Sequence, residues 1–243
     1  MNKNNITVAT ITWARDEQEE SLLRASLQVL AELEIPVFVC DGGSGNNFLD
    51  FLRSFPHFTI VERKAKGLWG QAQSSLLAAS HTASPFILYT EPDKKDFFRN
   101  SLPGFIAAAK DDDQLGILLA SRSATAFATF PAFQRSTETT INNCCGELIG
   151  RPFEYTYGPF LLTRQVVPYL ENVANDIGWG WRPYAFNIAH RLGYKVESFE
   201  GDFNCPETQR EDSMAERMYR MRQLTQNIEG LLLSANAIIN PAR

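Results

Sequence analysis

The chain of 243 residues lacks any long hydrophobic segment, because no apolar run reaches the roughly 18 residues that a membrane-spanning helix needs. It also lacks an excess of positive charge: 23 Lys and Arg against 28 Asp and Glu give a net charge of −5. That balance argues against bulk binding to nucleic acid or anionic lipid. The polar segment Met1–Asn5 has no signal-peptide core. We therefore expect a cytoplasmic protein with no transmembrane segment and no nucleic-acid partner.

Cysteine is scarce, and its spacing fits neither a disulfide framework nor a zinc site, since Cys144 and Cys145 are adjacent and Cys40 and Cys205 stand alone. We expect four reduced thiols. The chain has no G-x-x-x-x-G-K-[ST] loop and no G-x-S-x-G turn, so the sequence gives no support to P-loop nucleotide hydrolysis or serine-hydrolase chemistry.

Short apolar segments alternate with helical periodicity in the first half of the chain. The patterns predict strands at 6–12, 36–40, 59–62, 85–90 and 115–120, separated by helices at about 16–33, 48–53, 71–80 and 101–110. Continuous apolar strands joined by crossover helices are typical of a mostly parallel sheet with helices on its faces. The fold class is therefore predicted as α/β.

The second half is less regular. We expect an aromatic loop and then a helix within 127–150, a strand at 158–163, a helix at 182–192, a strand at 194–199 and a closing helix at about 212–236. No repeat, low-complexity tract or linker interrupts the chain, which favours a single domain.

Polar loops follow several of the predicted strands at their carboxyl ends, where open parallel sheets bind ligands. Asp41–Gly45 follows the second strand, and its glycines allow a ligand to approach the backbone closely. Glu91 and Asp93 follow the fourth strand, and two carboxylates at i and i+2 can hold a hard divalent cation. The alternatives are a plain strand-to-helix turn and a polar turn, respectively.

A basic segment, Arg63–Gln71, leads into the third helix. Lys64–Gly70 is expected to be a loop, and cations together with backbone amides at a helix N-terminus form an anion site. A solvated basic loop is the alternative.

The order of these motifs resembles the nucleotide-sugar-dependent glycosyltransferases of the GT-A fold, especially the family 2-like group. The features that carry the resemblance are the first strand with its acidic helix start, an Asp-Gly-x-Ser loop, a Lys-Gly loop and an Asp-x-Asp-like motif: Thr10–Glu17, Asp41–Ser44, Lys66–Gln71 and Glu91–Asp93. The resemblance implies a Rossmann-like sheet with a nucleotide-binding half at about 1–120 and an acceptor half at about 121–243.

The resemblance also implies roles for individual residues. The nucleotide would contact Thr12, Glu17, Asp41, Lys66 and Glu91, with Asp41 at the base and Lys66 at the nucleotide or its phosphates. A divalent metal, Mn²⁺ or Mg²⁺, would be held by Asp93 and Glu91. Asp93 would be the firmer ligand, because the second carboxylate has that role in such enzymes. Glu91 departs from the family pattern, which has Asp at that position.

In the acceptor half, Asp176 lies where inverting enzymes of this fold place the general base, which would deprotonate an acceptor hydroxyl. A helix-capping role is the alternative. Trp179 and Trp181 could stack on a sugar or anchor the core. A third metal ligand could be His190 or Asp202, and the sequence does not choose between them.

The sequence thus predicts a hexosyl-type transferase that uses a nucleotide-sugar donor and an unidentified acceptor, inverting or retaining. The rivals are a sugar nucleotidyltransferase and a non-catalytic nucleotide-sugar-binding relative. The first lacks its usual glycine-rich loop after strand one, and Glu91 is the feature in favour of the second. The closing helix, rich in charge, has a solvated face or forms a homo-oligomer contact.

Overall fold

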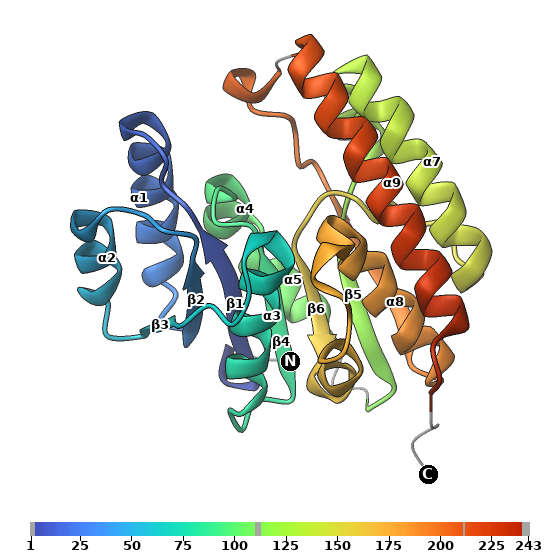
Figure 1. Ribbon diagram of the computed structural model, residues 1–243, viewed down its shortest axis with the longest axis horizontal. Helices are drawn as coiled ribbons and strands as arrows, with labels where there is room; N and C mark the ends of the chain where they lie inside the picture. The colour runs from blue at the N-terminus through green and yellow to red at the C-terminus, as the bar shows by residue number, and fades with distance from the viewer. Residues whose placement is uncertain (1–2, 110–112, 211, 240–243) are drawn as a thin grey trace. The chain divides into compact units, whose positions relative to one another are not determined.

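The β-branched segment near the start of the chain forms strand β1 (Ile6–Thr12), which lies between β2 (Val37–Asp41) and β4 (Phe86–Thr90). The computed structural model describes residues 3–109, 113–210 and 212–239 (Figure 1). The chain divides into two compact units, one of Met1–Asp112 with Pro159–Asp176 and one of Asp113–Gly158 with Ile177–Arg243. The single-domain organisation stays a prediction.

In the first unit the strand order is β3 (Phe58–Val61), β2, β1, β4 and β6 (Phe160–Thr163). The pairs β3–β2, β2–β1 and β1–β4 are parallel, and β6 runs antiparallel to β4. The helices of this unit are α1 (Glu17–Ala31), α2 (Asn46–Arg53), α3 (Gly67–Ser80), α4 (Lys95–Asn100) and α5 (Leu102–Ala108). The predicted alternation is confirmed here, while α4 was not predicted and residue 110 of the expected helix lies outside the described residues.

Local capping explains where α1 begins. The Asp16 carboxylate accepts a hydrogen bond from the backbone N–H of Glu19 at 2.8 Å, which satisfies one of the free amides of the first turn. Acidic residues at positions 17, 19 and 20 complement the positive end of the helix dipole. The acidic residues at the start of α1 therefore stabilise the helix, independently of any ligand.

The start of α3 corrects the sequence prediction. The helix begins at Gly67 rather than at 71, so the expected loop Lys64–Gly70 shortens to its first three residues. Gly70 packs so closely on the preceding segment that an added Cβ would lie 2.2 Å from the Ala65 carbonyl oxygen. Glycine looked like a loop residue in the pattern, but here it serves close packing inside a helix.

The second unit pairs β5 (Leu115–Arg122) in parallel with β7 (Lys195–Gly201). Its helices are α6 (Ala124–Ala128), α7 (Ala132–Ile149), α8 (Trp181–Arg191) and α9 (Met214–Asn236), and α9 packs on both α7 and α8 (Figure 1). Short 3₁₀ segments complete the described chain at Lys3–Asn5, Arg164–Leu170, Asn175–Gly180 and Glu207–Gln209. The α/β class with a mostly parallel sheet is confirmed.

Each unit has its own apolar core. Trp69 and Trp181 are fully buried, one in each unit, so the sugar-stacking alternative for Trp181 is wrong. Cys40 is also buried, and burial raises the pKa of its thiol to about 11, which keeps the thiol protonated and inert. Across residues 3–109, 113–210 and 212–239, none of the helices has the length and apolar character needed to cross a bilayer.

A buried charge cluster lies at the end of β5 in the second unit. Arg122 is 3% exposed and donates hydrogen bonds to Glu138 and Glu154 at 2.7 Å each. Its guanidinium also lies over the rings of Phe127 and Phe130, at 4.7 and 4.3 Å from their centroids. These rings belong to the aromatic stretch expected to be a loop, which here covers the arginine.

The Glu154 carboxylate makes the stability of this unit depend on pH in the acid range. Burial opposes its ionisation, but the charge of Arg122 and hydrogen bonds from Arg122 and Thr156 outweigh burial and hold the pKa of Glu154 below its usual range. In the acid range the unfolded chain therefore binds more protons at this residue than the folded protein does. The stability that Glu154 contributes is present above the unfolded pKa and is lost as pH falls through the folded one.

We expect Glu154→Gln to lower the free energy of unfolding at pH 7 by about 3 kcal/mol, because Arg122 loses a buried partner. The deficit should begin to shrink as pH falls below the unfolded pKa of about 4.3 and should vanish only below the lower folded pKa, where wild-type Glu154 is neutral as well. Urea unfolding measured across the acid range checks this. Exposed Glu147 on α7 gives the control Glu147→Gln, whose pH curve should parallel the wild type. A deficit for Glu154→Gln that does not change with pH would contradict the role of the charge.

Candidate functional site

The first unit has a topological switch point at its carboxyl edge. The order β3-β2-β1-β4 reverses its direction of growth between β1 and β4, and open α/β sheets bind ligands outside such a point. Strand register places Thr12 at the end of β1 level with Asp41 at the end of β2, and the last residue of β4, Thr90, level with Thr10. Thr10 also donates a hydrogen bond to the Thr90 carbonyl at 2.8 Å. The loops after β1, β2 and β4 therefore begin at one edge.

The Asp41 carboxylate holds two of these loops together. One oxygen accepts hydrogen bonds from the backbone N–H groups of Gly43 and Ser44 at 2.8 and 2.7 Å. The other accepts from the hydroxyls of Ser44 and Thr12 at 2.7 and 2.8 Å. The Ser44 hydroxyl in turn accepts from the Ala14 N–H at 2.8 Å, which ties the β1 loop to the β2 loop. With four donors, the carboxylate has its acceptor positions filled.

The Gln71 side chain of α3 binds backbone groups at the same edge. Its side-chain amide donates to the carbonyls of Thr12 and Cys40 at 3.0 and 3.1 Å, and Gln71 is buried. Arg63 donates to the Gly42 carbonyl at 3.1 Å. The ends of β1 and β2 and the basic segment before α3 are thus joined through carbonyls that a parallel sheet leaves open at its edge.

Trp13, one residue past β1, presents an aromatic ring at this edge. It is 53% exposed, and the guanidinium of Arg15 lies 5.6 Å from its ring centroid. A Cβ at position 42 would lie 2.9 Å from Trp13 Cβ, so Gly42 is required for the Trp13 backbone and ring to sit there. A large exposed aromatic plane beside polar loops suits stacking on a planar ligand.

Glu91 and Asp93 occupy the loop between β4 and α4, both half-buried, and Glu91 Oε2 is shielded from solvent. No group of three or more His, Cys, Asp or Glu side chains in the described part of the chain is arranged to hold a metal. Mg²⁺ commonly takes one or two carboxylates, with substrate phosphates and waters completing its shell. The two carboxylates fit that mode of binding, with oxygen donors that suit Mg²⁺ or Mn²⁺.

Lys66 is the N-cap residue of α3, and its side chain is exposed. The first turn of α3 contains no acidic residue. Arg63 and Lys64 precede it, so positive charge and free amides gather at this helix end, as an anion site requires. Glu17 is the exposed first residue of α1.

Asp176 is exposed and ends the first unit, within the 3₁₀ segment Asn175–Gly180. The chain just before it is anchored to α3. Trp69 Nε1 donates to the Val173 carbonyl at 3.2 Å, and the Gln73 amide donates to the carbonyls of Leu170 and Glu171 at 3.0 Å each. One helix therefore carries the basic N-terminus and fixes the segment that leads to Asp176.

The remaining candidates lie in the second unit. His190 is exposed near the end of α8, and exposed Asp202 accepts a hydrogen bond from Ser123 at 2.6 Å. Trp179 is half-buried and donates from Nε1 to the Tyr219 hydroxyl at 2.9 Å. The choice of a third metal ligand stays open.

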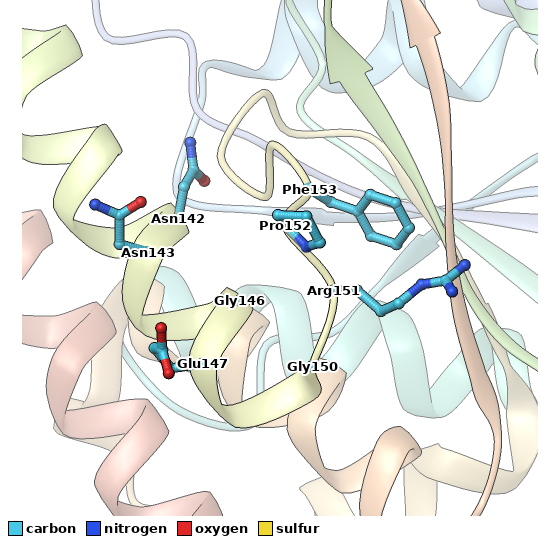
Figure 2. A pocket seen from close by; sticks show the side chains of 8 residues that line it. All are labelled: Asn142, Asn143, Gly146, Glu147, Gly150, Arg151, Pro152 and Phe153. Atoms are coloured by element: carbon cyan, nitrogen blue, oxygen red, sulfur yellow. The ribbon is translucent and has the colours of Figure 1, made fainter.

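A cavity of about 460 Å³ lies in the second unit, between the last turns of α7 and the segment Arg151–Phe153 (Figure 2). Figure 2 shows the side chains of Arg151 and Phe153 pointing away from α7. Asn142 in its wall already accepts a hydrogen bond from the Tyr155 N–H at 2.8 Å. A smaller apolar cavity of about 240 Å³, lined by Leu33 and Ile35 among others, lies where the chain leads into β2. Neither cavity is lined by a candidate site residue.

No family model matches this chain, and no curated protein sequence does. Solved structures do. A glucosyl-3-phosphoglycerate synthase from Mycobacterium tuberculosis in complex with UDP is 14% identical, with a TM-score of 0.65 over 96% of this chain and 81% of that one. The same synthase with Mn²⁺, UDP-glucose and phosphoglyceric acid gives 14% and 0.63 over the same shares. A mycobacterial protein gives 18% and 0.65, over 98% of this chain and 77% of that one. At these identities the likeness shows the fold, and the predicted GT-A-type architecture is confirmed.

Sequence reasoning missed several residues that build this edge. Gln71 and Gln73 looked like ordinary helix residues, and only the tertiary structure shows their amides bonded to carbonyls of distant segments. Trp13 carried one usable signal, since it is a large aromatic residue directly after a strand, in an otherwise polar loop. The predicted roles of Thr12, Glu17, Asp41, Lys66, Glu91, Asp93 and Asp176 stay predictions, and their positions are the ones described above.

We expect Asp41→Asn to destabilise the unliganded protein by about 1–3 kcal/mol. The amide would place an N–H₂ donor where a carboxylate oxygen now accepts two hydrogen bonds, so those two donors would lose their acceptor. Thermal and urea unfolding of the unliganded protein check this. Asp50→Asn, at an exposed position paired with Arg53, is the control and should change stability little. Wild-type stability in Asp41→Asn would show that the carboxylate does not hold the loops.

Proposed function

We propose that this protein is a glycosyltransferase that moves a sugar from a uridine-diphosphate sugar to a hydroxyl of an acceptor, assisted by a divalent metal. The observation that carries the proposal is the carboxyl edge of the first unit at its switch point, where an aromatic plane follows β1, a basic helix N-terminus follows β3 and two carboxylates follow β4. Similar solved structures hold UDP, UDP-glucose and Mn²⁺, which supports this choice of donor and metal.

In this proposal different residues bind the base and the diphosphate of the donor. The Trp13 ring stacks on the base, and stacking of this kind contributes about 1–3 kcal/mol. Thr12 and Asp41 act by fixing the loop beneath the base, since the Asp41 acceptors are already filled. Glu17 lies at the rim of the proposed donor site, while Lys66 and the backbone amides at the start of α3 bind the diphosphate.

Glu91 and Asp93 hold the metal in the proposal, with Asp93 the firmer ligand and Glu91 also near the ribose. When bound, a divalent cation neutralises negative charge on the diphosphate as it leaves. The protein's own cations, Lys66 and Arg63, add to that neutralisation from the α3 side.

The reaction forms a bond between the acceptor oxygen and the anomeric carbon, and it breaks the bond from that carbon to the diphosphate, so UDP leaves. If the reaction inverts the anomeric centre, the Asp176 carboxylate takes the acceptor proton as general base. The acceptor stays unidentified. We place the activity in the cytoplasm, in line with the composition.

The donor site is tested by thermal shift against UDP, GDP, CDP and TDP, each with and without Mn²⁺. We expect UDP with Mn²⁺ to stabilise the wild type, by about 2.7 kcal/mol when the nucleotide is at one hundred times its Kd. Asp93→Asn should lose the metal-dependent part of the shift, and Trp13→Ala should weaken UDP binding with or without metal. The control is Asp96→Asn, three residues further along and exposed, which should behave like the wild type. No shift with any nucleotide would overturn the proposal.

The catalytic step is tested with a donor-hydrolysis assay that uses UDP-glucose and water as acceptor. If Asp176 is the base, Asp176→Asn should lower kcat by about 10²- to 10⁴-fold and leave the KM for UDP-glucose unchanged. Asn175→Ala is the neighbouring control. Nuclear magnetic resonance of the released sugar gives its anomeric configuration. Retention, or an active Asp176→Asn, would remove the base role from Asp176, and UDP binding without any turnover would favour a non-catalytic nucleotide-sugar-binding protein.

A further inference from the structure

Helix α9 has an unusual distribution of side chains between its buried and exposed faces. Its buried positions are mostly small or polar: Asn227, Gly230, Leu231 and Ser234. The buried Ser234 hydroxyl accepts a hydrogen bond from the Asn187 amide at 2.9 Å, and the half-buried Gln226 on the same helix accepts one from the Trp179 N–H at 3.2 Å. A helix on the surface of a water-soluble unit normally turns its apolar face inward. Here Leu231 is buried, but most of the other large apolar side chains of α9 are exposed.

The outward side chains form a heptad stripe. Met214, Met218, Met221 and Leu232 are 71, 57, 42 and 56% exposed. Together with Thr225, Ile228 and Ala235 they follow the alternating spacing of four and three residues that marks the a and d positions of a coiled coil: Met214, Met218, Met221, Thr225, Ile228, Leu232 and Ala235. Three of the four methionines of the chain lie on this one stripe.

The stripe cannot be turned inward by rotating the helix. A Cβ at Gly230 would lie 2.0 Å from the Gly180 carbonyl oxygen, and a Cβ at Gly180 would lie 2.0 Å from the Gln226 carbonyl oxygen. Only glycine on each side allows the two backbones to approach so closely. Placing a Leu or Met side chain at that contact would break it, so the packing fixes which face of α9 points outward.

The charges beside the stripe are self-complementary. Arg222 and Glu229 are both exposed, stand seven residues apart and so occupy the same e position of successive heptads. In the described part of the chain neither makes an ion pair, whereas Arg217 and Arg220 on the same helix do. In an antiparallel pair of helices, e positions of one helix face e positions of the other, so Arg222 of each copy would meet Glu229 of the other.

We propose that α9 is a homodimer interface, in which two copies of this chain pair their α9 helices antiparallel about a two-fold axis. The axis passes near Thr225 and Ile228, which face each other across it. In the same register Met221 meets Leu232 and Met218 meets Ala235, so every exposed apolar side chain of the central stripe gains an apolar partner. Two Arg222–Glu229 pairs flank this seam, as a two-fold axis requires.

A second copy explains this surface better than a lipid bilayer does. An interfacial helix carries cations around its polar face, whereas the flank of this stripe alternates Arg222 with Glu229 at the spacing that matches itself. The stripe also keeps one register over three heptads, which an oriented protein partner requires and a lipid surface does not. The helix is 23 residues long, so about 34 Å of it is available for pairing.

The oligomeric state is measured by sedimentation velocity and light scattering on the full chain over a wide concentration range. We expect the wild type to dimerise and Met218→Glu to be a monomer. Arg222→Glu should raise the dimer Kd by at least about tenfold, because two attractive pairs become repulsive. The double variant Arg222→Glu/Glu229→Arg should restore the wild-type Kd, which a merely structural effect would not do.

Leu22→Glu, on the exposed surface of α1, is the control and should leave the dimer intact. Circular dichroism of each variant shows that it is folded, so a monomer is not mistaken for a misfolded chain. A wild type that is monomeric at every concentration, or a dimer that the charge reversal does not weaken, would overturn the proposal. So would a monomeric wild type that floats with vesicles of phosphatidylcholine and phosphatidylglycerol, which would assign the stripe to a membrane surface.

Discussion

Parallel strands leave backbone carbonyls and loop amides open at their carboxyl ends, and the first unit depends on how these groups are satisfied. The Gln71 amide binds the carbonyls at the ends of β1 and β2, and the Asp41 carboxylate binds amides and hydroxyls of the loops that follow. A buried group left without a partner would cost about 1–3 kcal/mol. The two side chains therefore fix the edge before any ligand arrives, and a preorganised edge lowers the entropy lost on binding.

The same helix that supplies Gln71 organises the rest of the candidate site. Its N-terminus gathers positive charge at Lys66, and Trp69 and Gln73 anchor the chain that leads to Asp176. Coupling through one rigid helix means that a shift of α3 would move its basic N-terminus and the segment that leads to Asp176 together. This arrangement gives a physical reason why two glutamines and a tryptophan are buried in α3, whose other buried residues are mostly small.

The second unit contains buried polar contacts in addition to its apolar core. Arg122 is held by Glu138 and Glu154 beneath the rings of Phe127 and Phe130, and α9 packs inward through glycines, amides and a serine. Buried polar contacts of this kind add little net stability but select one arrangement over others. Because small and polar residues of α9 form its buried face, several of its large apolar side chains are exposed. The proposed dimer would bury those side chains.

The sequence by itself determined the α/β class, the position of nearly every strand and the order of the loops at the carboxyl edge, because these follow from local periodicity and from turn residues. It placed Asp41, Glu91 and Asp93 at strand ends, and the parallel pairing of β2, β1 and β4 puts those ends at one edge of the sheet. It missed the start of α3 at Gly67 and the antiparallel course of β6, and it left open whether Trp181 is a core residue, which the structure shows it to be. Only the tertiary structure decided that Asp41 is filled by four donors, that Trp13 is exposed and that α9 turns its methionines outward. Hydrogen bonds and close glycine contacts between residues far apart in the chain have no period along it, so no pattern in the sequence records them.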